Sequence, residues 1–169
     1  MVKWHLYRLL QQTVTQYPRE IAVLVLPVPL HPACNSAVRA EPSQNAQACE
    51  FARLFLAMWQ TAPKEFPEFS HWLMAARLPP AFPEARNKAQ RAAGSTAISL
   101  VLLDGRIYDR VKQAVELYQT LAVDKLPQIL LADRMIVGRM DSLKELHAVI
   151  RLAPSDPAKT QCAITNKVL

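Results

Sequence analysis

The sequence predicts an α/β fold in which a small sheet carries an inserted block of helices, and three observations support this. A continuous apolar run at residues 21–26 follows a first amphipathic segment and has the composition of a strand buried on both faces. Residues 45–123 contain several segments with helical periodicity. Near the C-terminal end, two short apolar runs flank Asp133-Arg134, a spacing that predicts a hairpin.

The composition is that of one folded domain with a sizeable core. The chain has 169 residues, of which 51% are hydrophobic and 20% are charged, so it belongs neither to the disordered nor to the low-complexity class. The formal net charge is +6, but Lys and Arg are scattered, so we expect a solvated basic surface and no nucleic-acid partner. The apolar runs fall short of the roughly 18 residues that a membrane span needs.

The first two elements are expected within the first thirty residues. Residues 3–17 predict an amphipathic helix, in which leucine and valine recur at spacings of three and four: Leu6, Leu9, Leu10 and Val14. We expect no secretory signal in this segment, because Lys3 and Arg8 are not accompanied by an apolar h-region. The predicted strand at 21–26 ends at a series of prolines, Pro27, Pro29 and Pro32.

Helices dominate the middle of the chain. Helical patterns cover residues 45–59, 63–76, 82–93 and 107–123, and Gly94 is a natural end for the third of these. Two strands are expected next, at 129–132 and 135–137, with Gly138 interrupting the second. A helix beginning at Asp141-Ser142 follows, and residues 153–169 are expected to form a flexible tail.

Several of these segments resemble a known family. The stretches LPVPLHPACN, QACEFARLFLAMWQ, FPEFSHWLM and LPQILLADRMIVGRMDSLKELHAVI are similar to bacterial thioredoxin-like proteins of the DsbA-like branch of thiol–disulfide oxidoreductases. The resemblance covers residues 3–152. It implies a thioredoxin-like domain at 1–152, with a helical insertion at 45–123 and with the first strand of the sheet missing.

The resemblance also implies a site and partners. In the family, a cis X-Pro bond offers backbone hydrogen bonds to an extended substrate, so Leu126 and Pro127 are the candidate substrate-binding residues. They should lie beside the start of the opening helix, next to a vacant edge of the sheet. The implied partners are protein thiols or disulfides, including a membrane-tethered redox partner, in a periplasmic or other extracytoplasmic compartment.

The chain departs from the family at the redox motif. The family's C-x-x-C stands at the start of the first helix, where the helix dipole favours a thiolate, and these 169 residues contain no C-x-x-C. Either the first strand and its cysteine pair precede Met1, or the pair has been lost. We therefore expect a relative of the oxidoreductases that has no catalytic residues and is inactive as given. The alternative is a non-catalytic thioredoxin-like protein-binding module.

The three cysteines allow two interpretations. Cys34 and Cys49 either pair in a disulfide that closes a loop of about 15 residues, contributing about 3 kcal/mol, or remain as buried thiols. Cys162 falls in the predicted tail. No cofactor or metal is expected, because the histidines are far apart in the sequence and no glycine-rich nucleotide loop occurs: His5, His31, His71 and His147.

Two further expectations concern the helical block. Its aromatic residues are expected to pack as core rather than to form the floor of a peptide groove: Trp59, Phe66, Phe69 and Trp72. The single acids Asp104 and Asp124 stand at turns or helix ends, so we expect helix caps rather than catalytic carboxylates.

Overall fold

Two compact units make up the chain, and the first is formed by both ends of the sequence. Unit 1 comprises Met1–Leu24 and Asp124–Leu169, and unit 2 comprises Val25–Val123. The computed structural model describes residues 2–17, 20–39, 46–75, 80–121, 126–138 and 140–151. The predicted tail at 153–169, with Cys162, and the acid Asp124 lie outside the described residues.

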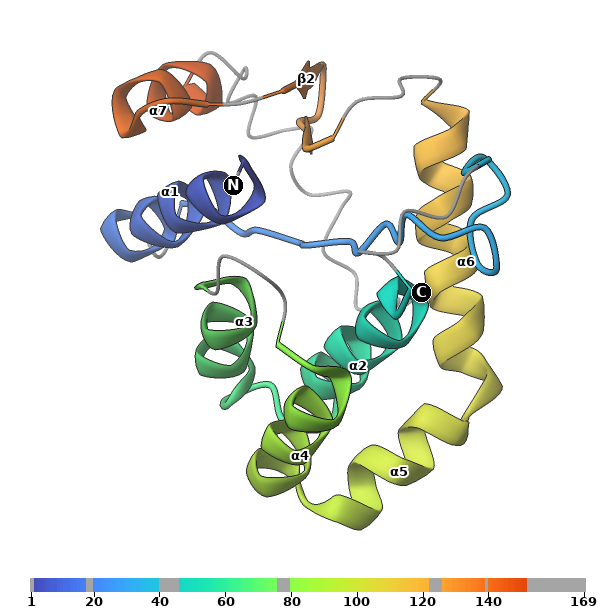
Figure 1. The fold of residues 1–169 in the computed structure, drawn as a ribbon. Helices are drawn as coiled ribbons and strands as arrows, with labels where there is room; N and C mark the ends of the chain where they lie inside the picture. The colour runs from blue at the N-terminus through green and yellow to red at the C-terminus, as the bar shows by residue number, and fades with distance from the viewer. Residues whose placement is uncertain are drawn as a thin grey trace. The chain divides into compact units, whose positions relative to one another are not determined.

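Unit 1 is built from two helices and a hairpin. The helices are α1 (Val2–Gln16) and α7 (Leu143–Arg151), and the strands are β1 (Gln128–Leu130) and β2 (Met135–Val137) (Figure 1). The strands are antiparallel, with Ile129 opposite Ile136. The helices and the hairpin expected near the two ends of the sequence are therefore present.

An apolar cluster joins the parts of unit 1. Its buried members come from α1, from α7 and from the segment before α7: Leu6, Leu9, Met140 and Leu146. Ile129 and Ile136 pack against this cluster from the hairpin. Because side chains alternate along a strand, Leu130 and Val137 lie on the opposite face, where they are 45% and 36% exposed.

Polar contacts also tie α1 to α7. Thr13 is fully buried, and its hydroxyl donates to the carbonyl of Leu9 at 2.8 Å. That bond uses the only hydroxyl hydrogen, so Nε2 of His147, at 3.1 Å from Oγ1, must be the donor to Thr13. The ring of His147 also meets Tyr17 edge-on, with 5.2 Å between centroids. His147 is thus held in place by α1.

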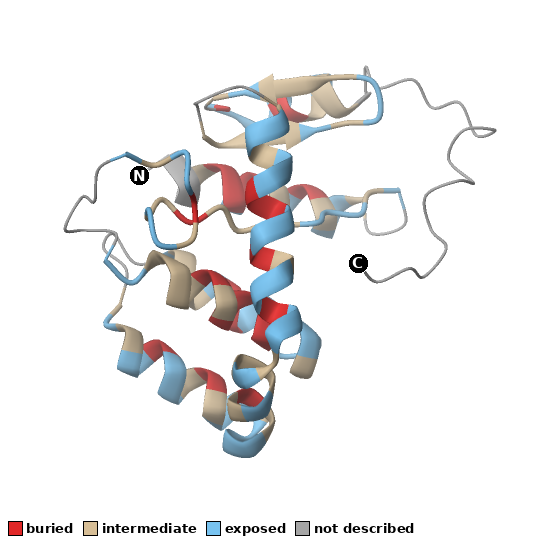
Figure 2. Cartoon of the chain, turned by 90° about the vertical axis from the view of Figure 1, so that its right-hand side faces the viewer, coloured by how far each residue is buried: buried red, intermediate tan, exposed pale blue. Residues whose placement is uncertain are grey.

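Unit 2 contains the helical block. Its helices are α2 (Ala48–Thr61), α3 (Phe66–Ala75), α4 (Phe82–Ala93), α5 (Ser95–Leu103) and α6 (Gly105–Thr120). The helix α2 is apolar on most of its surface and contacts all of the others. Leu54, Met58, Phe69 and Ile98 are almost fully buried around it. Figure 2 shows that α6 buries one stripe of its surface and exposes the rest.

The junctions between these helices follow from single residues. Gly94, between α4 and α5, has φ +89°, a backbone conformation that residues with a Cβ rarely adopt. Asp104 caps α6, because its Oδ1 accepts a hydrogen bond from the backbone N–H of Arg106 at 2.9 Å. The expectation that Asp104 is a helix cap is confirmed.

The predicted strand at residues 21–26 is wrong. The structure assigns no regular secondary structure there, and Val23, Leu24 and Leu26 are 39%, 65% and 41% exposed. A strand is held by ladder hydrogen bonds to a neighbour, and the described residues offer no strand that pairs with this run. The described sheet has two strands, so the larger thioredoxin-like sheet stays a prediction.

Two features of the helical block also differ from expectation. The helix α5 was not predicted, because its sequence STAISLVLL is apolar without a helical period. Trp59 is 41% exposed rather than part of the core, whereas Phe69 is buried and Phe66 and Trp72 pack against the core.

Among the described helices, none combines the length and the apolar character that a membrane crossing requires.

The cap at Asp104 predicts an acid dependence of stability. Hydrogen bonds from Arg106 hold the pKa of Asp104 below its ordinary value. The stabilisation is therefore complete above the ordinary aspartate pKa of about 3.9 and is lost as the pH falls below it. Thermal unfolding followed by circular dichroism from pH 6 to pH 2.5 should show a steeper fall of the midpoint for the wild type than for Asp104→Asn. Parallel curves would contradict this role.

Candidate functional site

The predicted substrate-binding residues stand at the entrance to the hairpin. The peptide bond between Leu126 and Pro127 is cis, and both residues are half-buried. The carbonyl of Pro127 accepts a hydrogen bond from the N–H of Gly138 at 3.0 Å, which extends the pairing of the two strands by one position. Gly138 has φ +105°, so a side chain there would be strained.

The start of α1 lies at the same end of unit 1. His5, on the first turn of the helix, has its Nε2 at 3.2 Å from the carbonyl oxygen of Asp141, to which it donates. Asp141 follows closely after Gly138, the partner of Pro127. Two residues that follow β2 therefore contact the two parts: Gly138 donates to the proline segment, and Asp141 accepts from His5 on α1.

The hairpin has an apolar outer face and an open edge. We call Leu130, Met135 and Val137 the outer hairpin face, because they lie opposite the side that packs on α1 and α7. In the part of the chain that the structure describes, β1 pairs with β2 and with no other strand. No described strand therefore lies on the second edge of β1, which we call its open edge, and exposed apolar side chains stand beside it.

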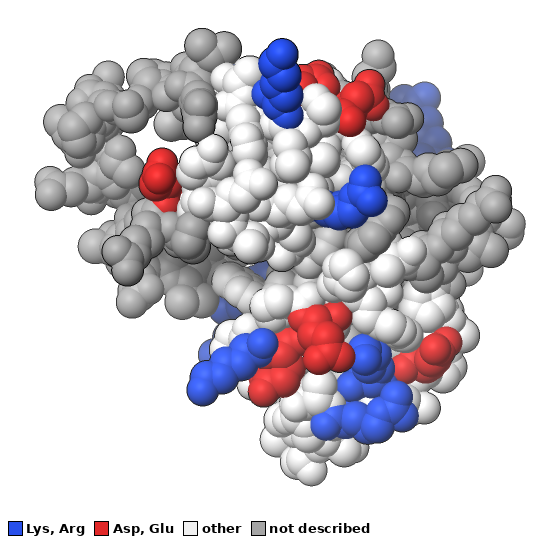
Figure 3. Space-filling view, turned by 90° about the vertical axis from the view of Figure 1, so that its left-hand side faces the viewer, with Lys and Arg blue, Asp and Glu red and all other residues white. Residues whose placement is uncertain are grey.

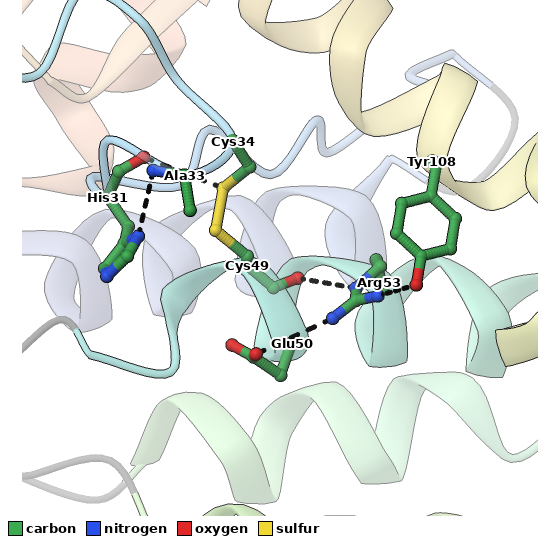
Figure 4. A network of polar contacts seen from close by, with 7 residues as sticks. All are labelled: His31, Ala33, Cys34, Cys49, Glu50, Arg53 and Tyr108. Carbon is green, nitrogen blue, oxygen red and sulfur yellow. Dashed lines mark hydrogen bonds and ion pairs between the residues drawn. A yellow bond between two sulfur atoms is a disulfide. The ribbon is translucent and has the colours of Figure 1, made fainter.

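In unit 2, the structure joins Cys34 and Cys49 in a disulfide (Figure 4). Their Cα atoms are 6.0 Å apart, and the bond closes a sequence separation of 15 residues. Both cysteines are half-buried. The disulfide links the loop that follows the proline-rich stretch to the first turn of α2.

A buried asparagine holds the same loop. Asn35 is 1% exposed, and its Nδ2 donates to the carbonyl of Pro29 at 3.0 Å. Its Oδ1 accepts from the N–H of Ala37 at 3.2 Å and from Nε2 of Gln119, on α6, at 3.4 Å. Sequence reasoning missed this residue, because an asparagine near prolines is typical of an exposed turn.

An arginine connects the disulfide end of α2 to α6. The Nε of Arg53 donates to the carbonyl of Cys49 at 3.4 Å, and its guanidinium lies 4.5 Å from the ring centroid of Tyr108 and donates to the tyrosine hydroxyl. Its Nη2 is 3.7 Å from Oε1 of Glu50, so each of the three guanidinium nitrogens has a partner (Figure 4). Arg53 and Tyr108 are 55 residues apart, which is why no local pattern indicated this contact.

The other residues considered from the sequence stay apart. His5 is on α1, His31 is in the loop before the disulfide, His71 is on α3 and His147 is on α7. Within the described ranges, no three His, Cys, Asp or Glu side chains come together in a way that could hold a metal ion. The structure therefore brings the two cysteines together and leaves the histidines dispersed.

Comparison of the chain with protein-family models, with curated proteins and with solved structures found no match. The thioredoxin-like assignment therefore rests on the sequence segments that carry the resemblance. The substrate-binding role of Leu126 and Pro127 stays a prediction as well.

The disulfide predicts a specific pattern of thiol reactivity and stability. Under denaturing conditions, Ellman's reagent should count one free thiol per chain without reduction, that of Cys162, and three free thiols after reduction. Replacing both Cys34 and Cys49 by serine should lower the free energy of unfolding by about 3 kcal/mol, because the unfolded chain regains the entropy of an open loop. Urea unfolding measures this difference. Cys162→Ser is the control, and an equal loss in the control would contradict the assignment.

Proposed function

We propose that the chain is a thioredoxin-like domain, related to thiol–disulfide oxidoreductases, that binds an extended segment of a partner protein at the open edge of β1. The binding site comprises that edge, the outer hairpin face and the proline segment Leu126-Pro127. The observation that carries this proposal is a described sheet of only two strands, with the apolar side chains of Leu130 and Val137 exposed on its outer face.

The chemistry of this edge suits an extended polypeptide. A strand that adds to a sheet edge gains main-chain hydrogen bonds, which are independent of its sequence, and places alternate side chains on one face. Leu130 and Val137 would cover apolar side chains of such a strand. A two-stranded hairpin is only marginally stable by itself, so an added strand also completes the sheet.

The order of the elements supports the family assignment. The described chain has a helix, a block of helices, a proline segment, a hairpin and a closing helix in the order that the resemblance implies, although the strand that it implies at 21–26 is not among the described elements. The scattered Lys and Arg of the sequence favour a protein partner over a nucleic acid. On the face shown in Figure 3, Lys and Arg lie among Asp and Glu and form no continuous basic patch.

The second candidate is a purely non-catalytic binding module, and the missing C-x-x-C favours it. The two candidates differ in what the partner must contain. A relative of the oxidoreductases should prefer partners with thiols or disulfides. A general binding module should bind a peptide and its cysteine-to-serine analogue with equal affinity.

We expect no catalysed disulfide exchange by residues 1–169. Insulin reduction by dithiothreitol, followed by turbidity, should proceed at the same rate with and without the protein, because the chain has no cysteine pair at the start of its first helix. Acceleration by the protein would contradict the proposal. The variant with Cys34→Ser and Cys49→Ser would then show whether the disulfide in unit 2 is the source.

The binding site itself is tested by a charge on the outer hairpin face. The probe is the insulin B chain with its cysteines alkylated, which is extended and cannot react. Leu130→Lys should weaken its binding about tenfold, because the substitution removes apolar contact and places a charge beside the added strand. Leu117→Lys, on α6, introduces the same charge at a similarly exposed leucine and should leave the affinity unchanged. Titrations followed by fluorescence anisotropy give both values, and equal affinities for the two variants would refute the site.

A further inference from the structure

The disulfide of unit 2 joins two segments of different structure. Cys34 lies in a loop, outside any helix or strand, whereas Cys49 is the second residue of α2. Both cysteines are half-buried, so burial by itself does not distinguish their sulfur atoms. The polar groups around each sulfur do distinguish them, and these groups decide which sulfur an incoming thiol attacks.

Cys49 stands where a thiolate is stabilised. The first backbone N–H groups of a helix have no partner within the helix and lie at the positive end of its dipole. In α2, Gln47 precedes the helix and makes no side-chain hydrogen bond to this turn. The acid of the turn, Glu50, pairs with Arg53 at 3.7 Å and points away from the disulfide (Figure 4). Cys49 is therefore the better leaving group.

The surroundings of Cys34 favour a neutral thiol. Its Sγ lies 3.8 Å from the carbonyl oxygen of His31 (Figure 4). In the reduced state an S–H group can donate to this carbonyl, which favours the thiol over the thiolate. The loop is also open to an anion, since residues 31–39 contain no acid and Ala33 and Ser36 are exposed. An approaching thiolate meets no carboxylate from this loop.

The loop has a second support that does not depend on the disulfide. Asn35 is buried and donates to the carbonyl of Pro29 at 3.0 Å. Nε2 of Gln119, on α6, donates to Oδ1 of Asn35 at 3.4 Å and to the hydroxyl of Ser36 at 3.2 Å. These contacts keep Cys34 close to α2 when the disulfide opens, so the opened protein can stay folded and close again.

We propose that Cys34 is a reversible thiolation site, at which a low-molecular-weight thiol forms a mixed disulfide while Cys49 leaves as a thiolate. The incoming thiol first loses its proton to water, and its sulfur then attacks Sγ of Cys34. The bond between the two cysteines breaks, and its electron pair goes to Sγ of Cys49. Each thiol opens one disulfide of the chain, so this is a modification rather than a turnover. It concerns unit 2 and is independent of the function proposed for the hairpin.

Reduced glutathione tests the site of attack. The folded variant Cys162→Ser, which keeps only the two cysteines of the disulfide, is mixed with excess glutathione, quenched early with N-ethylmaleimide and digested for mass spectrometry. Glutathione on Cys34 with maleimide on Cys49 should exceed the inverse pattern about tenfold, because the better leaving group departs. Equal amounts, an excess of the inverse pattern, or a disulfide that glutathione does not open would overturn the proposal.

Two isosteric substitutions at opposite ends of α2 test the physical cause in the same Cys162→Ser background. Gln47→Glu places a carboxylate at the start of the helix, where it opposes a second negative charge, so the preference for Cys34 should fall about threefold. Gln60→Glu is the matched control, since Gln60 accepts a hydrogen bond from Arg110 at 3.1 Å far along the helix, and it should leave the preference unchanged. Circular dichroism establishes that both fold. The same preference in both variants would refute the leaving-group assignment.

Discussion

The apolar contact between α1 and α7 is the interaction on which unit 1 depends. It joins the two ends of the described chain, and the hydrogen bond from His5 to Asp141 spans 136 residues of sequence. The hairpin has no other described apolar support than this cluster, through Ile129 and Ile136. Isolated short helices and two-stranded hairpins are marginal in water, so the proline segment and the open edge hold their geometry only while this contact exists.

In unit 2, the first turn of α2 holds the surrounding segments together. Cys49 fixes the preceding loop, Arg53 reaches Tyr108 on α6, and Glu50 pairs with Arg53. These three side chains come from one short stretch of helix and contact different partners. The disulfide and the contact between α2 and α6 therefore share a structural support. A change in this turn would affect both.

Sequence reasoning could find those features that depend on local patterns. The amphipathic period of α1, the turn at Asp133-Arg134 and the cap at Asp104 are each set by neighbouring residues, and all are present in the structure. The strand expected at 21–26 failed because an apolar run becomes a strand only where another strand pairs with it. The helix α5 was missed since an apolar run without a period fits either structure.

In the candidate sites, too, residue types could be identified from the sequence but long-range contacts could not. The prolines and cysteines could be singled out by residue type, whereas Gln119, which binds Asn35, and Tyr108, which binds Arg53, come from segments far away in the sequence. Their roles follow from tertiary packing, which a single sequence does not display.

The dependence of unit 1 on the contact between α1 and α7 is tested most directly by hydrogen exchange in the variant Leu146→Ala. Leu146 is fully buried in the shared cluster, so the account predicts faster amide exchange in α1, in the hairpin and in α7 together. The amides of α2 and α4 should keep their protection. Faster exchange confined to α7, with α1 and the hairpin unchanged, would contradict the account.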